Sequence, residues 1–230
     1  MKVKLLNVFK SIGLIFSIIL FPTFLLLVLG IDLSNLSDSE YIFYLAISNL
    51  VLLVIFMLIY KDTLIKDFNC FKKNFIHNIE ISFKYWFIGF IIMALSNLFI
   101  NYILHKGLAG NEEQVRNYID AFPLFMIFNT VIYAPITEEL AFRKSVKDSI
   151  SNKWVYVLTS GLVFGMLHIS SYITDVSDLV YLIPYSSLGI SFALLYYKTN
   201  NIFSSISMHA IHNLIAVIIY LIGVNIWKSL

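Results

Sequence analysis

The sequence predicts an all-α integral membrane protein, a polytopic bundle of about seven transmembrane helices. Of its 230 residues, 59% are hydrophobic and only 13% are charged, whereas soluble domains carry about 25% charged and about 45–50% apolar residues. A soluble core of this length could not bury so much apolar surface and still cover itself with polar groups. A soluble enzyme, a nucleic-acid-binding domain and a disordered chain are therefore excluded, and the net charge of +2 suggests no nucleic-acid partner.

Apolar runs that lack Lys, Arg and, with few exceptions, Asp and Glu are the third observation, because about 20 such residues cross the hydrocarbon core. In chain order the seven runs cover residues 12–31, 41–60, 85–104, 122–142, 155–173, 179–197 and 202–224. The first run is too long for a signal-peptide core and no small-residue cleavage site follows it, so we expect it to be retained. Residues 1–121 would then form an N-terminal membrane region of three spans, residues 122–224 a core of four spans and residues 225–230 a short tail.

The basic residues predict the orientation. Thirteen of the sixteen fall on one side of the predicted membrane, namely Lys2, Lys4, Lys10, Lys61, Lys66, Lys72, Lys73, Lys84, Arg143, Lys144, Lys147, Lys153 and Lys198. Only Lys106, Arg116 and Lys228 fall on the other side, together with eight acidic residues. The positive-inside rule then places the N-terminus in the cytoplasm and the C-terminus outside. The residue usage suits an AT-rich bacterial gene, so we expect a bacterial plasma membrane.

The fourth span ends in two carboxylates. Glu139 lies four residues before Arg143, which puts the two on one helix face with the acid in the favourable N-terminal position. Glu138 points about 100° away and has no local partner, so it is the better candidate for chemistry as a general base. Pro135 removes a backbone donor and disturbs the preceding turn, which would open space for water. Alternatively, both glutamates only cap the cationic loop.

Three of the five histidines also lie inside predicted spans. His168 shares a face with Phe164, and Gly161 and Gly165 form a small-xxx-small pair that lets another helix approach closely. In the last span, Ser205, His209 and Asn213 lie at four-residue spacing on one helix face, and His212 flanks this stripe. Such a stripe must face protein or water rather than lipid. The alternative is that these groups only hydrogen-bond between helices and stabilise the bundle.

Together the three pieces resemble the CAAX protease and bacteriocin-processing (CPBP, Abi) family of intramembrane proteases, whose pattern is EExxxR, FxxxH and HxxxN. Here the pattern reads Glu138-Glu139-Leu140-Ala141-Phe142-Arg143, then Phe164-Gly165-Met166-Leu167-His168, then His209-Ala210-Ile211-His212-Asn213. Each motif alone is weak, but three in order within a polytopic chain are fairly specific. The resemblance covers roughly residues 122–223.

The resemblance implies a peptidase that uses a glutamate-activated water. By this analogy Glu138 is the general base, His168 holds and polarises the water, and His209 and Asn213 donate to the oxyanion of the tetrahedral intermediate. Glu139, Arg143 and Phe164 would organise the site, whereas His212 and Ser205 lie outside the shared pattern and have open roles. Amide hydrolysis needs an activated nucleophile and donors aimed at the developing charge, which these residue types supply. We expect a cavity that opens toward the cytoplasm, with the site part-way into the membrane.

We favour a site without a cofactor. Zinc held by Glu138, His168 and His209 would also generate a nucleophilic water, but the sequence has no HExxH motif. The single cysteine, Cys70, forms no intrachain disulfide and lies in a basic loop far from the motifs.

The expected partners are the lipid bilayer and a peptide or small membrane-associated protein as substrate, in peptide maturation or bacteriocin self-immunity. Two other functions compete with this hypothesis. One is a non-catalytic membrane scaffold or immunity protein in which the motif residues serve packing. The other is a small proton-coupled transporter that uses Glu138 and the histidines as a relay, although the first half of the chain lacks a polar counterpart of the second. Substrate, cleavage position and oligomeric state are not encoded in any recognisable pattern.

Overall fold

The computed structural model describes residues 5–228, with side chains up to Gly223, and within that range it contains helices and no strands. The all-α prediction is confirmed, since seven helical segments of this range are long and apolar enough to cross a membrane. The orientation evidence from Lys2 and Lys4 lies outside the described residues. So do residues 229–230 of the predicted 225–230 tail, whose preceding part continues the last helix to Lys228.

The first half of the chain forms three spans and three shorter helices. Their bounds are α1 (Leu5–Leu29), η1 (Leu33–Asn35), α2 (Asp38–Ile59), α3 (Lys61–Lys73), α4 (Phe75–Tyr102) and α5 (Gly110–Ala121). Helix α1 ends at Leu29 and is followed by Gly30, whose φ of 65° is the left-handed conformation that glycine adopts at helix C-termini. Helix α2 begins with a capping box in which Ser37 and Glu40 satisfy each other's backbone N–H groups.

The second half contains the four remaining spans, of which the first is interrupted. That span consists of α6 (Pro123–Ile127), η2 (Phe128–Tyr133), α7 (Ala134–Glu138), η3 (Glu139–Ser145) and α8 (Val146–Ser149). The other three comprise α9 (Lys153–Ile169) with η4 (Ser170–Tyr172), η5 (Val176–Tyr181) with α10 (Leu182–Thr199), and α11 (Ile202–Lys228). Segments η2 and η3 are π-helical, whereas η1, η4 and η5 are short 3₁₀ helices.

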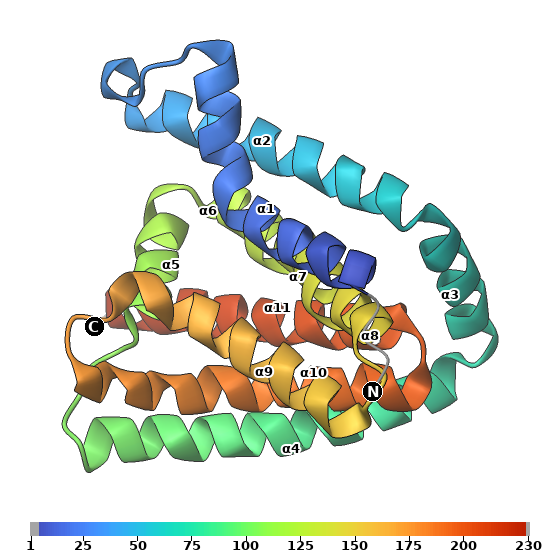
Figure 1. The fold of residues 1–230 in the computed structure, drawn as a ribbon. Coiled ribbons are helices and arrows are strands. Elements are labelled where there is room, and N and C mark those ends of the chain that lie inside the picture. The colour runs from blue at the N-terminus through green and yellow to red at the C-terminus, as the bar shows by residue number, and fades with distance from the viewer. Residues whose placement is uncertain (1–4, 229–230) are drawn as a thin grey trace.

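Helices α4 and α5 differ most from the sequence prediction. Helix α4 begins at Phe75, ten residues before the predicted start at 85, because Glu80 and Lys84 end the apolar run but leave the helical backbone bonds intact. Helix α5 was not predicted, since its polar sequence lies in what reads as a loop. It packs against α6 and α9 at one end of the bundle (Figure 1).

Helix α10 lies at the centre of the second half and contacts α4, α9 and α11 (Figure 1). The predicted close approach at Gly161 and Gly165 is confirmed. A Cβ on Gly161 would lie 2.7 Å from the backbone nitrogen of Ile190, and one on Gly165 would lie 3.0 Å from that of Ser186. The glycines thus let α9 and α10 pack almost backbone to backbone.

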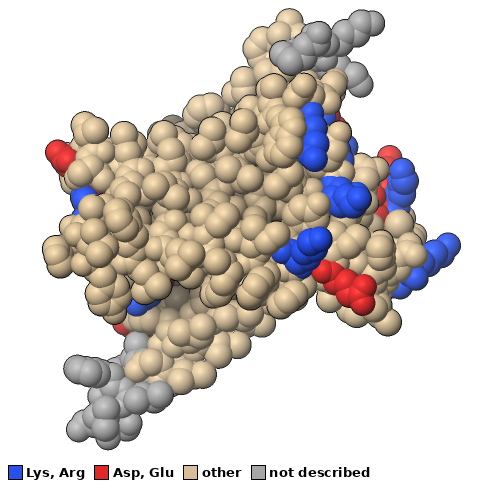
Figure 2. Space-filling view, turned by 90° about the horizontal axis from the view of Figure 1, so that it is seen from below, with Lys and Arg blue, Asp and Glu red and all other residues tan. Residues whose placement is uncertain are grey.

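The charged side chains gather at the two ends of the molecule. Figure 2 shows Lys and Arg mainly at one end and a broad uncharged surface between the ends. Large apolar side chains are exposed on this band; Leu27 is 77% exposed and Leu124 is 83% exposed. Exposure of this extent is expected of residues that face lipid, and the chain is an integral membrane protein.

Candidate active site

The predicted site residues lie on three neighbouring spans, and the first of these spans is irregular at the site. The N–H of Ala134 bonds to the carbonyl of Asn129, an i→i−5 bond that widens the turn just before Pro135. The predicted disturbance at Pro135 is therefore confirmed. A second π-helical segment begins at Glu139, so Glu138 and Glu139 lie at the junction of two helix types. Such bulges often occur at functional sites.

Glu139 and Arg143 form a fully buried ion pair, as their spacing predicts. Arg143 Nε lies 3.1 Å from Glu139 Oε2, and both side chains are 0% exposed. Arg143 Nη1 donates to Ser160 Oγ at 3.3 Å, and Ser160 Oγ donates to the carbonyl of Phe142. The guanidinium also lies over the ring of Phe164, 4.6 Å from its centroid. The pair is thus held by contacts on two helices and has no access to solvent.

His209 lies between the two glutamates. Its Nδ1 is 3.0 Å from Glu139 Oε1, and since a carboxylate paired with Arg143 can only accept, Nδ1 is the donor. Its Nε2 is 3.8 Å from Glu138 Oε2. The ring stacks on Phe192 with centroids 5.2 Å apart. His209 therefore has one nitrogen fixed by Glu139 and the other turned toward Glu138.

Glu138 differs from Glu139 in lacking a hydrogen-bond partner. Its Oε2 is buried, and no hydrogen bond within residues 5–228 reaches it. The side chain as a whole is 15% exposed, so it has some access to water. Buried polar atoms without a partner are rare in native proteins and need an explanation. A carboxylate oxygen in this state is free to accept a hydrogen bond from a water molecule.

His168 lies one helical turn beyond Phe164. Its Nδ1 is 2.8 Å from the carbonyl of Phe164, and because a carbonyl only accepts, Nδ1 carries the proton and Nε2 of the neutral ring is an acceptor. The Phe164 ring packs against His168 with centroids 4.3 Å apart and against His209 with centroids 6.0 Å apart. On its other side His168 stacks on Tyr185 at 5.1 Å. Phe164 therefore links the two histidines.

The remaining candidates have partners outside this group. Asn213 Nδ2 donates to the carbonyl of Thr130 at 2.7 Å, in the first π-helical segment, which leaves one of its two amide hydrogens free. Ser205 is fully buried and donates to the carbonyl of Ile202 at 3.1 Å. His212 Nδ1 accepts from Trp86 Nε1 at 3.3 Å, so the neutral ring carries its proton on Nε2.

Three contacts of the site were missed in the sequence. Ser160 lies four residues before Phe164 and shares its helix face, so that spacing was a usable signal. Trp86 is 126 positions from its partner His212, and Tyr185 is on a different span from His168. No local pattern indicates either contact.

The candidate zinc ligands do not form a metal site in the described part of the chain, where no three His, Cys, Asp or Glu side chains converge around one point. His168 and His209 each have Nδ1 bonded to a protein group, so only Nε2 of each ring is left for an ion, and Glu138 Oε2 lies 3.8 Å from His209 Nε2. A site without a cofactor stays a prediction, and we derive no step through a metal.

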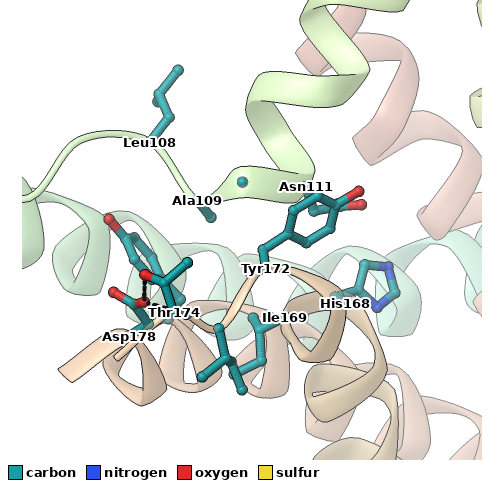
Figure 3. Close-up of a pocket in the computed structure, with 11 residues that line it drawn as sticks. Leu108, Ala109, Asn111, His168, Ile169, Tyr172, Thr174 and Asp178 are labelled. Carbon is teal, nitrogen blue, oxygen red and sulfur yellow. Dashed lines mark hydrogen bonds between the residues drawn. The ribbon is translucent and has the colours of Figure 1, made fainter. Parts of the chain in front are cut away.

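His168 also lines a pocket of about 170 Å³ at the end of the bundle that carries α5. In Figure 3, His168 and Asn111 lie to one side of Tyr172, and Thr174 and Asp178 lie to the other. Lys106 Nζ donates to Asp178 Oδ1 at 2.7 Å, and this hydrogen bond raises the pKa of Lys106. This pocket opens at the end opposite the lysine-rich one, so the cavity reached by His168 is not at the end where a cytoplasmic opening was expected.

Comparison with known proteins finds a family match in the part of the chain that holds the candidate site. Residues 120–215 match the model of the type II CAAX prenyl endopeptidase Rce1-like family, a range that contains every candidate site residue named above. The resemblance to the CAAX protease and bacteriocin-processing family is therefore confirmed. No solved structure matches the chain significantly.

Three curated relatives illustrate the similarity. The chain is 29% identical over 148 residues to a Bacillus subtilis protein named "Putative membrane peptidase YdiL", covering 57% of each chain. It is 29% identical to an uncharacterized Mycoplasma capricolum protein, covering 68% of this chain and 48% of the relative. It is 25% identical to the Lactococcus lactis UPF0177 protein YbdI, covering 75% of this chain and 94% of the relative. The chain thus spans about half the length of the first two.

Proposed function

Since residues 120–215 match the Rce1-like endopeptidase family, we propose that this chain is an intramembrane endopeptidase that hydrolyses a peptide bond through a water activated by Glu138. The observation that carries the proposal is the buried, unpartnered Oε2 of Glu138, 3.8 Å from His209 Nε2. The other acids and bases of the motif each have a hydrogen bond or ion pair of 3.1 Å or less among the described residues, whereas Glu138 has only the 3.8 Å approach of His209. Glu138 is therefore the group left free to take a proton.

In the proposed reaction Glu138 accepts one proton of the water, and the Nε2 lone pair of His168 accepts a hydrogen bond from the other. The water oxygen bonds to the carbonyl carbon of the substrate. His209, whose Nδ1–H is already bound to Glu139, can donate to the oxyanion only from a protonated Nε2, and Asn213 donates its free amide hydrogen. The C–N bond then breaks, and Glu138 passes its proton to the leaving amine.

Glu139 and Arg143 act as positioning residues in this scheme. Their ion pair fixes the Oε1 of Glu139, which fixes the tautomer and the orientation of His209. The substrate is a peptide or a membrane-associated protein. Peptide maturation and bacteriocin self-immunity are the settings that the family resemblance predicts, and both stay predictions.

The test compares Glu138→Gln with Glu113→Gln, a glutamate in the first turn of α5 that lies outside the site. Both variants and the wild type are expressed in cells lacking the native protein, and peptide N-termini of the membrane and secreted fractions are mapped by mass spectrometry. We expect N-termini that depend on the wild type, persist with Glu113→Gln and fall by about 10²–10⁴-fold with Glu138→Gln, the usual contribution of a general base. Unchanged processing by an inserted Glu138→Gln protein refutes the assignment of the base. Absence of wild-type-dependent N-termini, together with flux of a solute into sealed vesicles, favours a transporter.

A further inference from the structure

The two ends of the bundle differ in how deeply the residues next to Glu138 and His168 are buried. The span 123–149 runs toward the lysine-rich end, where Lys144 and Lys147 lie. Beyond Glu138 in this direction, Glu139, Leu140 and Arg143 are completely buried, with 0% exposure. On α9, Tyr156 is likewise 0% exposed at the same end. Two turns of close-packed helix therefore separate the site from the lysine-rich end.

The opposite end is open. The pocket of about 170 Å³ is bounded by the connection between α4 and α5 and by the connection between α9 and α10, and His168 is one of its lining residues. Asn111 Nδ2, in the first turn of α5, donates to the hydroxyl of Tyr185 at 3.4 Å, and Tyr185 stacks on His168. The pocket therefore reaches the histidine that would hold the catalytic water, whereas Glu138 and His209 are not among its lining residues.

The lining suits hydrated polar groups. At about 30 Å³ per molecule the pocket holds about six waters. Asp178 anchors one wall by accepting from the backbone N–H groups of Thr174 and Asp175 and from Lys106, so the walls are held by bonds of their own. The free ring nitrogen of His168 faces no competing partner among the hydrogen bonds described for residues 5–228.

We propose that water and the substrate reach the site through this pocket, from the α5 end of the bundle, so that the enzyme cleaves a polar peptide segment presented on the side of the membrane opposite the lysine-rich face. On the orientation that the lysines predict, this side is the outside of the cell. The substrate is then a segment that has already crossed the membrane rather than a cytoplasmic one. The proposal deepens the proposed function and rests on it for the chemistry, but its accessibility test does not need peptidase activity.

The first experiment measures access to position 168 without any substrate. In a Cys70→Ser background, His168→Cys is exposed to a membrane-impermeant methanethiosulfonate reagent in spheroplasts and in inverted vesicles. We expect reaction in spheroplasts, slowed roughly tenfold when Ala109→Trp fills the pocket and unchanged by Ala121→Trp at the far end of α5. In a parallel sample of the unsubstituted protein, Cys70, which is exposed on α3, serves as the opposite marker and should react only in inverted vesicles. Reaction of His168→Cys only in inverted vesicles, or equal rates with both tryptophans, overturns the route.

The second experiment links the route to the substrate. Ala109→Cys and Ala121→Cys, both in the Cys70→Ser background, are labelled in spheroplasts, and processing is measured before labelling, after labelling and after reduction. We expect labelling to reduce processing by the Ala109→Cys protein roughly tenfold, with recovery on reduction, and to leave the Ala121→Cys protein unaffected. Labelled Ala109→Cys that processes at its starting rate overturns the proposed substrate path, even if water enters there. Lack of processing by the unsubstituted protein refutes the peptidase function instead, and the accessibility result still decides the route.

Discussion

Replacing Arg143 with Met removes the guanidinium from a fully buried ion pair and leaves Glu139 with a charge in a site that excludes water. Both side chains are 0% exposed and the charged atoms are 3.1 Å apart. At an effective dielectric constant of about 20, their Coulomb attraction is about 5 kcal/mol. Measured losses for removing one member of a buried pair are about 3–5 kcal/mol. We therefore expect Arg143→Met to lower the free energy of unfolding by about 3–5 kcal/mol.

The assay is thermal unfolding of the detergent-solubilised protein. For soluble domains of this length each kcal/mol shifts the midpoint by about 2–4 °C, so the expected loss is roughly 6–20 °C. The double variant Glu139→Gln/Arg143→Met should recover most of the loss, because the uncompensated charge is gone and the glutamine oxygen can still accept from His209 Nδ1. The interaction between the two substitutions is thus expected to be strongly non-additive.

Arg116 and Glu112 provide a matched control with the same four-residue spacing. Their atoms are 2.9 Å apart, but the side chains are 37% and 42% exposed, and exposed pairs contribute only about 0–1 kcal/mol. Arg116→Met should therefore shift the midpoint little. If Arg143→Met is as mild as Arg116→Met, or if the double variant loses the sum of the two single losses, the buried pair does not make the contribution to stability assigned to it.

Three further outcomes are expected. Gly161→Ala should destabilise the protein by about 1–3 kcal/mol in the same unfolding assay, because its Cβ would lie 2.7 Å from Ile190 N, whereas Gly13→Ala, with no atom within 4 Å of its Cβ, should not; equal effects would contradict the close packing. Burial raises the pKa of Asp67 above its ordinary 3.8, so its contribution to stability is complete below that value and is lost as pH rises through the raised pKa. Asp67→Asn keeps an acceptor for the N–H of Ile202, and its thermal midpoint should therefore rise relative to that of the wild type as the pH increases above 3.8; a constant difference would refute this. Chelation of divalent metals should leave processing unchanged, and stoichiometric zinc in active purified protein would overturn the metal-free mechanism.

Local spacing was sufficient for part of the site. The four-residue interval between Glu139 and Arg143 predicts their ion pair, and Gly161 and Gly165 predict the close approach of α9 and α10. Both are contacts that a helix imposes on neighbouring turns or on one face. The seven spans follow for the same reason, because the thickness of the bilayer sets the length of an apolar run.

Contacts between residues far apart in the chain could not be predicted from local spacing. The bond between Trp86 and His212 joins positions far apart in the chain, and its existence depends on how α4 packs against α11. The π-helical segments depend on which carbonyl each N–H selects, a choice that hydropathy does not record. The pocket beside His168 was not predicted, because its position depends on α5, a polar segment with no apolar periodicity to reveal it.

The sequence and the structure agree that Glu138, unlike Glu139, has no close polar partner. A buried carboxylate oxygen without a hydrogen-bond partner lowers stability, yet the neighbouring Glu139 shows that this fold can give a buried glutamate both an ion pair and a hydrogen bond. Active sites often retain such destabilised groups because the chemistry needs them. Glu138→Gln should therefore abolish processing while leaving the thermal midpoint unchanged or raising it, since a neutral amide costs less to bury than a carboxylate. A clear fall in the midpoint would mean that Glu138 supports the fold, and the case for it as the free base would fail.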